Sequence, residues 1–92
     1  MKYYDWSKDK NEELKEERGV CFEDIITALN DGRELNRIDH PNKKKYSNQT
    51  LLIVNIENYA YIVPFVEDEE KIFLKTIIPS RKMTKKYLAK VK

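Results

Sequence analysis

The C-terminal stretch of this chain, residues 71–92, joins an apolar run to a basic one. Residues 72–78 (Ile-Phe-Leu-Lys-Thr-Ile-Ile) lie between an acidic turn and a Pro-Ser pair, and such a β-branched run predicts one buried strand. Beyond it, Met83, Tyr87 and Leu88 share one face at helical spacing, which predicts a short helix with its lysines outside that face. The stretch contains eight Lys or Arg and no Asp or Glu, so we expect the strand and the helix to hold cations in fixed positions.

Two more apolar runs, residues 51–56 and 59–66, have the composition of strands, and the short turn between them predicts a hairpin. Together with residues 72–78 they predict three antiparallel strands in meander order. Residues 33–39 alternate weakly and predict an edge strand, while residues 3–6 predict a short strand or an extended entry. The sequence therefore predicts a small sheet with edge strands beside the meander.

Two helices are predicted ahead of this meander. Residues 8–18 are strong helix formers between Ser7, a suitable N-cap, and Gly19, a suitable C-terminal residue. The second helix begins at Phe22, where apolar residues recur at i, i+3, i+4 and i+7, and it closes at an Asn-Asp-Gly sequence. We therefore predict one α+β domain over residues 1–92, with two N-terminal helices packed on a small antiparallel sheet and a basic C-terminal helix.

The charges of the chain are unevenly divided. Residues 1–40 hold seven Lys or Arg against eleven Asp or Glu, a net charge of −4, whereas residues 41–92 hold eleven against five, a net charge of +6. The C-terminal half is therefore the candidate anion-binding half.

The cysteine content and the start of the chain bear on the compartment. The single cysteine, Cys21, excludes an internal disulfide, and the charged start of the chain does not read as a signal peptide. The longest apolar run is far shorter than a membrane span. We therefore expect a cytoplasmic protein that does not insert into a membrane.

Several kinds of catalytic site are disfavoured by composition. One histidine and one cysteine do not supply the three or four ligands of a zinc site. The two glycines, both at predicted helix ends, leave no glycine-rich phosphate loop. A Ser-His-Asp arrangement would have to use His40 and lacks a nucleophile-elbow context. We therefore expect no metal and no cofactor.

Two basic segments, residues 40–46 and 80–87, remain as candidates for binding an anionic partner. Lysine and arginine with interleaved tyrosine suit single-stranded RNA, because cations attract phosphates and unstacked bases lie on tyrosine or guanidinium planes. The residues expected to contact RNA are Lys43, Lys44, Tyr46, Ser80, Lys82, Lys85, Lys86 and Tyr87. A structural interpretation stands beside this one, since loop lysines are usually solvated and a helical tyrosine often belongs to the core.

RNA cleavage through the neighbouring 2′-hydroxyl needs a group to take the 2′ proton, cations on the phosphate and an acid for the leaving oxygen. Histidine is the side chain whose ordinary pKa suits proton transfer near neutrality, and His40 is the single histidine of the chain. Arg81 can hold a phosphate through two hydrogen bonds. We predict that the loop at residues 40–46 brings His40 and Lys45 beside Arg81 to form a catalytic site. The alternative is that His40 is a turn residue only.

Short patches spread along the chain resemble the sequence pattern of a known toxin family. They are Asp5-Trp6, Lys10-Asn11, Arg18-Gly19 followed by Phe22-Glu23-Asp24, then Ile77-Ile78, Ser80-Arg81-Lys82, Thr84 and Tyr87. In this spacing, from about residue 4 to residue 88, the chain resembles the BrnT-like toxins of bacterial type II toxin–antitoxin pairs.

The resemblance implies an α+β domain similar to the RelE toxins and a metal-independent endoribonuclease activity that cleaves mRNA, on the ribosome or free, and arrests translation. It also implies a cognate antitoxin with a ribbon-helix-helix DNA-binding region. The chain departs from the family at residues 17–19, which are Glu-Arg-Gly instead of Lys-His-Gly, and at residues 78–81, which are Ile-Pro-Ser-Arg instead of Ile-Ser-Ala-Arg. Arg81 matches the pattern, whereas the role of the missing histidine does not transfer and His40 stands outside the pattern.

Two other functions stay open on the sequence alone. A non-catalytic module that binds nucleic acid or a transcriptional-regulator partner is favoured by the lack of a second proton-transfer group suited to neutral pH. A toxin directed at gyrase, or another non-nuclease toxin on the same scaffold, is a third reading, because a fold does not fix a function.

Overall fold

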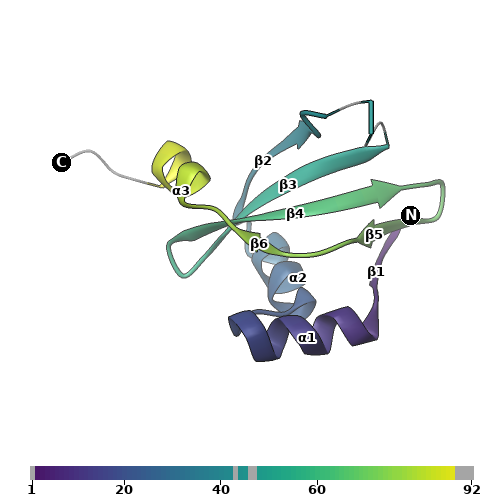
Figure 1. The fold of residues 1–92 in the computed structure, drawn as a ribbon, viewed down its shortest axis with the longest axis horizontal. Coiled ribbons are helices and arrows are strands. Elements are labelled where there is room, and N and C mark those ends of the chain that lie inside the picture. Colours follow the sequence, from purple (N-terminus) through teal and green to yellow (C-terminus); the bar gives the residue numbers. More distant parts are fainter. Residues whose placement is uncertain (1, 43, 46–47, 89–92) are drawn as a thin grey trace.

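The computed structural model describes residues 2–42, 44–45 and 48–88. Within them the chain forms three helices and six strands, with β1 first and α3 last (Figure 1). The helices are α1 (Lys8–Arg18), α2 (Phe22–Asn30) and α3 (Arg81–Tyr87). The strands are β1 (Tyr3–Trp6), β2 (Glu34–Asp39), β3 (Gln49–Ile56), β4 (Tyr59–Glu67), β5 (Lys71–Leu74) and β6 (Ile78–Pro79). None of the three helices found there has the length and apolarity that crossing a membrane requires.

The strands form one mixed sheet in the order β1-β5-β4-β3-β2, with β6 paired to β4 on the side of β5. Strands β3, β4 and β5 run antiparallel in chain order, which confirms the predicted meander, and β2 is the predicted edge strand. Strand β1 precedes the helices and pairs in parallel with β5, Tyr3 lying opposite Lys71. The short strand expected at residues 3–6 is present, but the prediction of an antiparallel sheet is wrong, because β1 and β5 are parallel. The helices carry the chain away from β1, and such a crossover allows a parallel neighbour that a tight turn cannot provide.

The run at residues 72–78 forms two short strands instead of the one predicted. Strand β5 ends at Leu74 and β6 begins at Ile78. Between them the backbone N–H of Lys75 donates to the carbonyl of Pro64 in β4 at 2.8 Å. Proline has no N–H with which to return a hydrogen bond, so the ladder with β4 is interrupted at this position.

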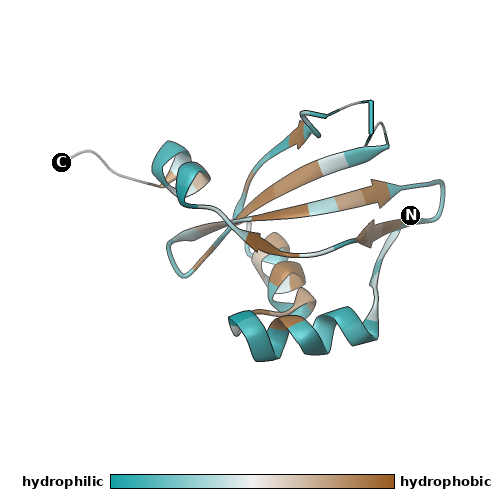
Figure 2. Ribbon diagram, in the orientation of Figure 1, coloured by the Kyte–Doolittle hydropathy of each residue, from teal (hydrophilic) through white to brown (hydrophobic). Residues whose placement is uncertain are grey.

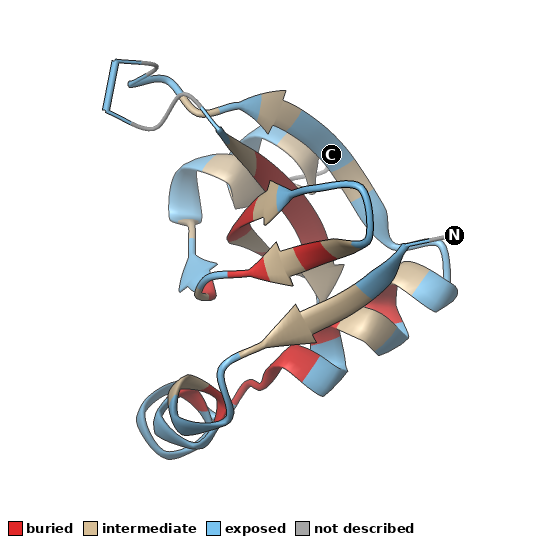
Figure 3. Ribbon diagram, turned by 90° about the vertical axis from the view of Figure 1, so that its right-hand side faces the viewer, coloured by how far each residue is buried: buried red, intermediate tan, exposed pale blue. Residues whose placement is uncertain are grey.

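The main core lies between the sheet and the helices α1 and α2. Its buried residues are Leu14, Val20, Phe22, Ile25, Ala28, Leu52, Val54, Val63, Phe65, Ile72, Leu74 and Ile77. Trp6 of β1 packs against this cluster and stacks on Phe22, with 5.6 Å between the ring centroids. Apolar residues are concentrated on the central strands and on α2, whereas α1 and α3 are largely hydrophilic (Figure 2). Burial follows the same division and is deepest in the middle of the sheet (Figure 3).

The predicted boundaries of α1 and α2 are confirmed. The Ser7 hydroxyl accepts the backbone N–H of Lys10 at 3.2 Å, as an N-cap does. Gly19 takes the left-handed conformation, with φ at 70°, that ends many helices. At the start of α2 the backbone N–H of Cys21 donates to the carboxylate of Asp24 at 3.1 Å, so this first-turn acid helps to cap the helix.

Helix α1 is attached to α2 by a buried asparagine, which the sequence showed only as part of the Lys10-Asn11 patch. Asn11 Oδ1 accepts the backbone N–H of Phe22 at 2.7 Å, and Asn11 Nδ2 donates to Glu23 Oε1 at 2.9 Å. Both polar groups of the side chain are therefore satisfied, although Asn11 is only 6% exposed. The hydrogen bond from Asn11 lowers the pKa of Glu23, because it stabilises the charged carboxylate.

Candidate nucleic-acid interface

Helix α3 begins at a cap that also ties it to the sheet. The Ser80 hydroxyl accepts the backbone N–H of Met83 at 3.1 Å, and the Ser80 backbone N–H donates to the carbonyl of Ala60 at 3.0 Å. Serine is favoured at this position because its side chain satisfies an N–H that the helix leaves free. The hydroxyl predicted to contact RNA is thus engaged in starting the helix.

Two further side chains fix α3 against the strands. The Thr84 hydroxyl accepts the backbone N–H of Ala60 at 2.9 Å and donates to the Ser80 carbonyl at 2.7 Å. The Tyr87 hydroxyl accepts a hydrogen bond from Asn36 Nδ2 in β2 at 2.8 Å. Tyr87 is half-buried, and this hydrogen bond ties the end of α3 to β2.

The face of the sheet that carries α3 is opposite to the one covered by α1 and α2. Leu52 and Val54 belong to the main core, so Ile53 between them points to the other face. Asn36 lies opposite Ile53 in the β2–β3 pairing, and Asn36 is the residue that binds Tyr87. Figure 1 shows α3 above the β3–β4 turn and the two other helices below the sheet.

Four cations of α3 form a surface that we term the α3 surface. They are Arg81, Lys82, Lys85 and Lys86. All four are exposed, and within the described part of the chain none of them forms an ion pair. Helix α3 has no acidic residue, whereas Arg37 and Lys71 on the strands are paired with Glu34 and Asp5. The α3 surface therefore presents charges that form no ion pair with any carboxylate of the described residues.

Arg18, at the end of α1, reaches the segment that precedes α3. Its Nη1 donates to the carbonyl of Ile77 at 3.2 Å, a contact between residues 59 positions apart. The patches at residues 18–19 and 77–82, which the sequence showed only as separate parts of one pattern, are therefore neighbours in space. A cation is favoured at a helix C-terminus, which is a local property, whereas this second contact joins distant parts of the chain.

The segment between β2 and β3 lies at the opposite end of the sheet from α3. The backbone N–H of His40 donates to the carbonyl of Gln49 at 3.2 Å, and Gln49 pairs with Val66 in β4. Ser80 is bonded instead to Ala60, six residues before Val66 and roughly 20 Å away at about 3.3 Å per residue. In Figure 1 the β2–β3 connection and α3 lie at opposite ends of the long axis.

The predicted cleft between His40, Lys45 and Arg81 is therefore wrong. Strand β3 is antiparallel to β4, so the connection leading into β3 lies where β4 ends. Helix α3 follows β6, which pairs near the start of β4. Both basic segments can be recognised in the sequence. Their separation in space follows from the directions of the strands, which the sequence does not show.

The described part of the β2–β3 connection has the geometry of a turn. His40 Nδ1 accepts the backbone N–H of Asn42 at 3.1 Å, and Asn42 Oδ1 accepts the backbone N–H of Lys45 at 3.3 Å. His40 therefore takes part in the turn. Lys44 and Lys45 are exposed. Two of the predicted RNA contacts lie outside the described residues: Lys43 and Tyr46.

Carboxylates gather at the same end of the molecule as His40. Lys2 and residues 67–70 (Glu-Asp-Glu-Glu) line an open hollow of about 790 Å³ beside the β4–β5 turn. Asp68 accepts the backbone N–H groups of Lys71 and Glu70, each at 2.8 Å, and these hydrogen bonds lower the pKa of Asp68. The negative charge at this hollow opposes the binding of a phosphate chain.

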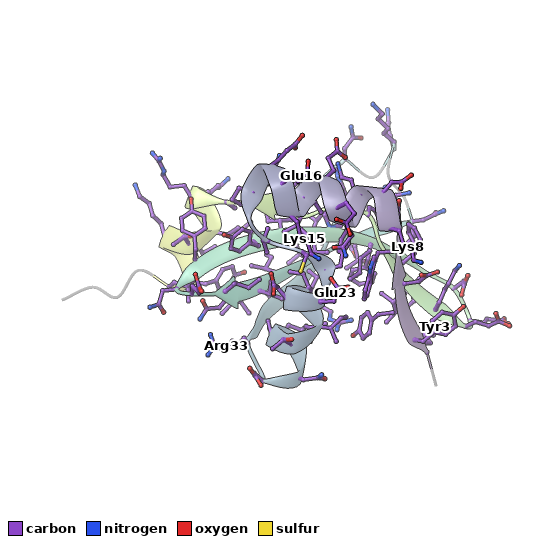
Figure 4. The ribbon with its side chains drawn as sticks, turned by 90° about the horizontal axis from the view of Figure 1, so that it is seen from below. Tyr3, Lys8, Lys15, Glu16, Glu23 and Arg33 are labelled. Carbon is purple, nitrogen blue, oxygen red and sulfur yellow. The ribbon has the colours of Figure 1, made fainter. Side chains whose placement is uncertain are left out.

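A smaller hollow, which we term the hairpin pocket, lies beside the β3–β4 turn on the helix side of the sheet. Its volume is about 310 Å³. The polar residues that line it include Asp24, Asp31, Arg33, Asn55, Glu57 and Tyr61. Arg33 is placed by its backbone, whose N–H donates to Ala28 at 2.8 Å and whose carbonyl accepts from Asn55 at 3.0 Å. Figure 4 shows the Arg33 side chain beside α2. The sequence interpretation did not predict this pocket, because its residues come from three separate segments.

Tyr61 links the hairpin pocket to the α3 surface. It lines the pocket, and it pairs across strands with Pro79, two residues before Arg81. Its ring meets the ring of Tyr59 edge-on, with 5.7 Å between the centroids. The pocket and the α3 surface therefore flank the same hairpin.

This end of the molecule offers guanidinium and ammonium groups for phosphates and aromatic rings for bases. Across residues 2–42, 44–45 and 48–88, no group of three His, Cys, Asp or Glu side chains is placed to hold a metal ion. The chain matches no protein-family model, no curated protein and no solved structure.

Proposed function

We propose that this protein is the toxin component of a BrnT-like toxin–antitoxin pair, which binds single-stranded RNA through the α3 surface and cleaves it at a phosphate held by Arg81. One observation carries the proposal: the four exposed cations of α3 have no carboxylate partner in the described chain. A polyanion supplies the missing partners, and each phosphate contact adds affinity by releasing counterions.

Arg81 is the residue of this surface best suited to the reaction. It is the first residue of α3, directly after the Ser80 cap, so its backbone position is fixed. A guanidinium donates two parallel hydrogen bonds to a phosphate, which an ammonium cannot do. Attack by the 2′-hydroxyl increases the negative charge on the phosphate oxygens, and a fixed guanidinium stabilises that charge in the transition state.

The proposal gives no catalytic role to His40 or Lys45, because both lie at the far end of the sheet. The tyrosines of the hairpin, Tyr59 and Tyr61, lie closer to the start of α3. Tyrosine can act as a proton acceptor or donor in general acid–base catalysis. We therefore assign proton transfer to the hairpin tyrosines and phosphate binding to Arg81.

The cognate antitoxin would occupy the same surface. A segment with carboxylates would neutralise the α3 surface, and apolar residues of that segment would cover Ile78, which is 40% exposed at the start of the same chain segment. Such a segment excludes RNA for as long as it is bound. A ribbon-helix-helix region in the antitoxin would bind DNA.

A second candidate function is RNA binding without cleavage. It is favoured by the position of His40, since the single histidine of the chain lies away from the α3 surface. In this case the protein acts by binding RNA or a regulator, and Arg81 contributes to the affinity without taking part in a reaction.

The first experiment is translation arrest on induction in a bacterial host. We expect Arg81→Ala to abolish the arrest and His40→Ala to leave it unchanged. Lys8→Ala, which removes an exposed cation of α1, is the matched control and should also leave it unchanged. Full arrest by the Arg81→Ala variant at equal expression would refute the proposed site.

The second experiment separates cleavage from binding. Purified protein is incubated with end-labelled RNA in EDTA at a stated salt concentration, and the products are resolved on a denaturing gel. Fragments that end in a 2′,3′-cyclic phosphate, and that are absent with Arg81→Ala, support the nuclease. Retarded but intact RNA in a native gel supports the second candidate.

A further inference from the structure

We propose that the hairpin pocket holds one unstacked guanine base of the bound RNA. This inference rests on the proposed RNA binding by the α3 surface and adds a base preference to it. Proteins that read single-stranded RNA take a base out of the stack, place it against an aromatic ring and bind its edge with hydrogen bonds. The pocket volume of about 310 Å³ lies at the small end of the range for ligand sites.

The wall of the pocket is rich in hydrogen-bond acceptors. Asp24, Asp31 and Glu57 all line it. The Asp24 carboxylate accepts the backbone N–H of Cys21, whereas the carboxylates of Asp31 and Glu57 have no partner among the described residues. A carboxylate accepts two parallel hydrogen bonds from adjacent donors. Among the four RNA bases, only guanine presents two adjacent donors, N1–H and N2–H₂, on its pairing edge.

The same pocket contains donors for the guanine oxygen. Arg33 lines the pocket with three carboxylates and forms no ion pair with any of them in the described chain. Asn55 Oδ1 accepts the backbone N–H of Asn58 at 2.9 Å, which leaves the Asn55 amide nitrogen to donate. Donors beside a carboxylate complement O6 beside N1–H and N2–H₂. Adenine has no oxygen on its pairing edge, and uracil has O4 beside N3–H but carries the acceptor O2 where guanine has its amino donor.

The position of Tyr61 connects this pocket to the phosphate site. Tyr61 lines the pocket and pairs with Pro79, two residues before Arg81. The pocket lies on the helix side of the sheet and α3 on the other side, so the proposal has one RNA strand pass round the β3–β4 hairpin, with a phosphate at Arg81 and a base against Tyr61. Stacking on an aromatic ring accepts any base. The carboxylates repel phosphates, so the pocket is suited to a base and not to the RNA backbone.

The experiment measures the affinity of the full chain for short labelled RNAs by fluorescence anisotropy at one salt concentration. Three probes are used: an all-uridine strand, the same strand with one central guanine, and the same strand with inosine, which lacks the N2 amino group, at that position. We expect the wild type to bind the guanine probe about tenfold more tightly than the inosine probe.

Asp31→Asn and Glu57→Gln are the variants that test the pocket. We expect the double variant to lose the guanine preference, while its affinity for all-uridine RNA stays equal or increases, because a negative charge is removed. Glu16→Gln removes an exposed carboxylate of α1 and should keep the preference. Circular dichroism confirms that each variant is folded.

Two negative results have different meanings. If the RNAs bind, Arg81→Ala weakens all three, and guanine and inosine probes bind equally, the guanine pocket is refuted and the proposed RNA binding stands. The guanine pocket is also refuted if the double variant still prefers the guanine probe to the inosine probe. If no probe binds, or if Arg81→Ala changes nothing, the proposed function itself fails.

Discussion

The Thr84 hydroxyl accepts the backbone N–H of Ala60 at 2.9 Å, so a side chain of α3 completes the hydrogen bonding of the β3–β4 hairpin. Ala60 is fully buried, and a buried N–H without an acceptor is costly. The same hydroxyl donates to the Ser80 carbonyl, which ties the helix cap to the hairpin. The position of the cationic helix therefore depends on a residue that carries no charge.

We expect Thr84→Val to lower the free energy of unfolding by about 1–3 kcal/mol, because the N–H of Ala60 loses its acceptor. RNA affinity should fall as well, since α3 is then less firmly held. Thr84→Ser keeps the hydroxyl and is the control. Urea denaturation followed by circular dichroism measures the change, and a Val variant as stable as the wild type would contradict the role given to this hydroxyl.

The salt dependence of RNA affinity should decrease with each cation of α3 that is removed. Replacing Lys85 and Lys86 by Gln should reduce the slope of log K against log salt by about 0.7 for each lysine that contacts a phosphate. The control variant replaces Lys8 and Lys15, which are exposed on α1 (Figure 4), by Gln. It should leave the slope unchanged. Equal slopes in the two pairs of variants would place the RNA elsewhere.

We expect Asn11→Ala to cost about 1–3 kcal/mol of unfolding free energy, because the backbone N–H of Phe22 is left without an acceptor in a buried position. Glu12→Ala, at an exposed neighbouring position, should change the stability little. Chemical denaturation of the three proteins measures the difference. A loss in Asn11→Ala no larger than in Glu12→Ala would show that the link between α1 and α2 contributes nothing.

The lowered pKa of Glu23 predicts a loss of stability in acid. The hydrogen bond from Asn11 favours the carboxylate in the folded protein, so its contribution is fully present above the ordinary pKa of 4.5. It is lost as the pH falls through the lower, folded pKa. We expect this part of the acid sensitivity to disappear in Glu23→Gln and in Asn11→Ala. Unfolding free energies measured from about pH 6 downward test it, and identical pH curves for all three proteins would exclude it.

Gly19→Ala should destabilise the protein by about 1 kcal/mol, because Gly19 has φ at 70° and a Cβ strains that conformation. For a domain of this size the melting temperature should fall by about 4–8 °C. No heavy atom lies within 4 Å of the added Cβ, so the effect comes from the backbone and not from a clash. Glu17→Ala is the control, and an unchanged melting temperature in Gly19→Ala would contradict the strain.

Local patterns predicted the elements of this fold well. The helix at residues 8–18, with its Ser7 cap and its glycine end, and the hairpin at residues 51–66 follow from signals that lie within a few residues of one another. The parallel pairing of β1 with β5 did not follow, because four extended residues do not identify their partner. The break at Lys75 followed only from its position opposite Pro64, which is a property of the pairing.

The sequence predicts which residues of the candidate site are basic, but it does not predict where they lie relative to one another. The basic composition of α3 and the place of Arg81 at its start could be read from the chain, since both are local. His40 and Arg81 are far apart because the connection before β3 lies at the end of β4, whereas α3 lies near the start of β4. The spacing of residues along the chain does not reveal these strand directions. The buried role of Asn11 and the pocket around Arg33 depend in the same way on contacts between distant segments.

The acidic β4–β5 turn and the cations of α3 lie at opposite ends of one molecule. The acidic turn shares its end of the molecule with the exposed Lys44 and Lys45, whereas α3 bears four cations and no carboxylate of its own. The local positive potential at α3 would attract a long polyanion before any contact forms, and the association rate would fall steeply as ionic strength rises. The carboxylates of the β4–β5 turn repel the same polyanion and so disfavour docking at that end without touching the ligand.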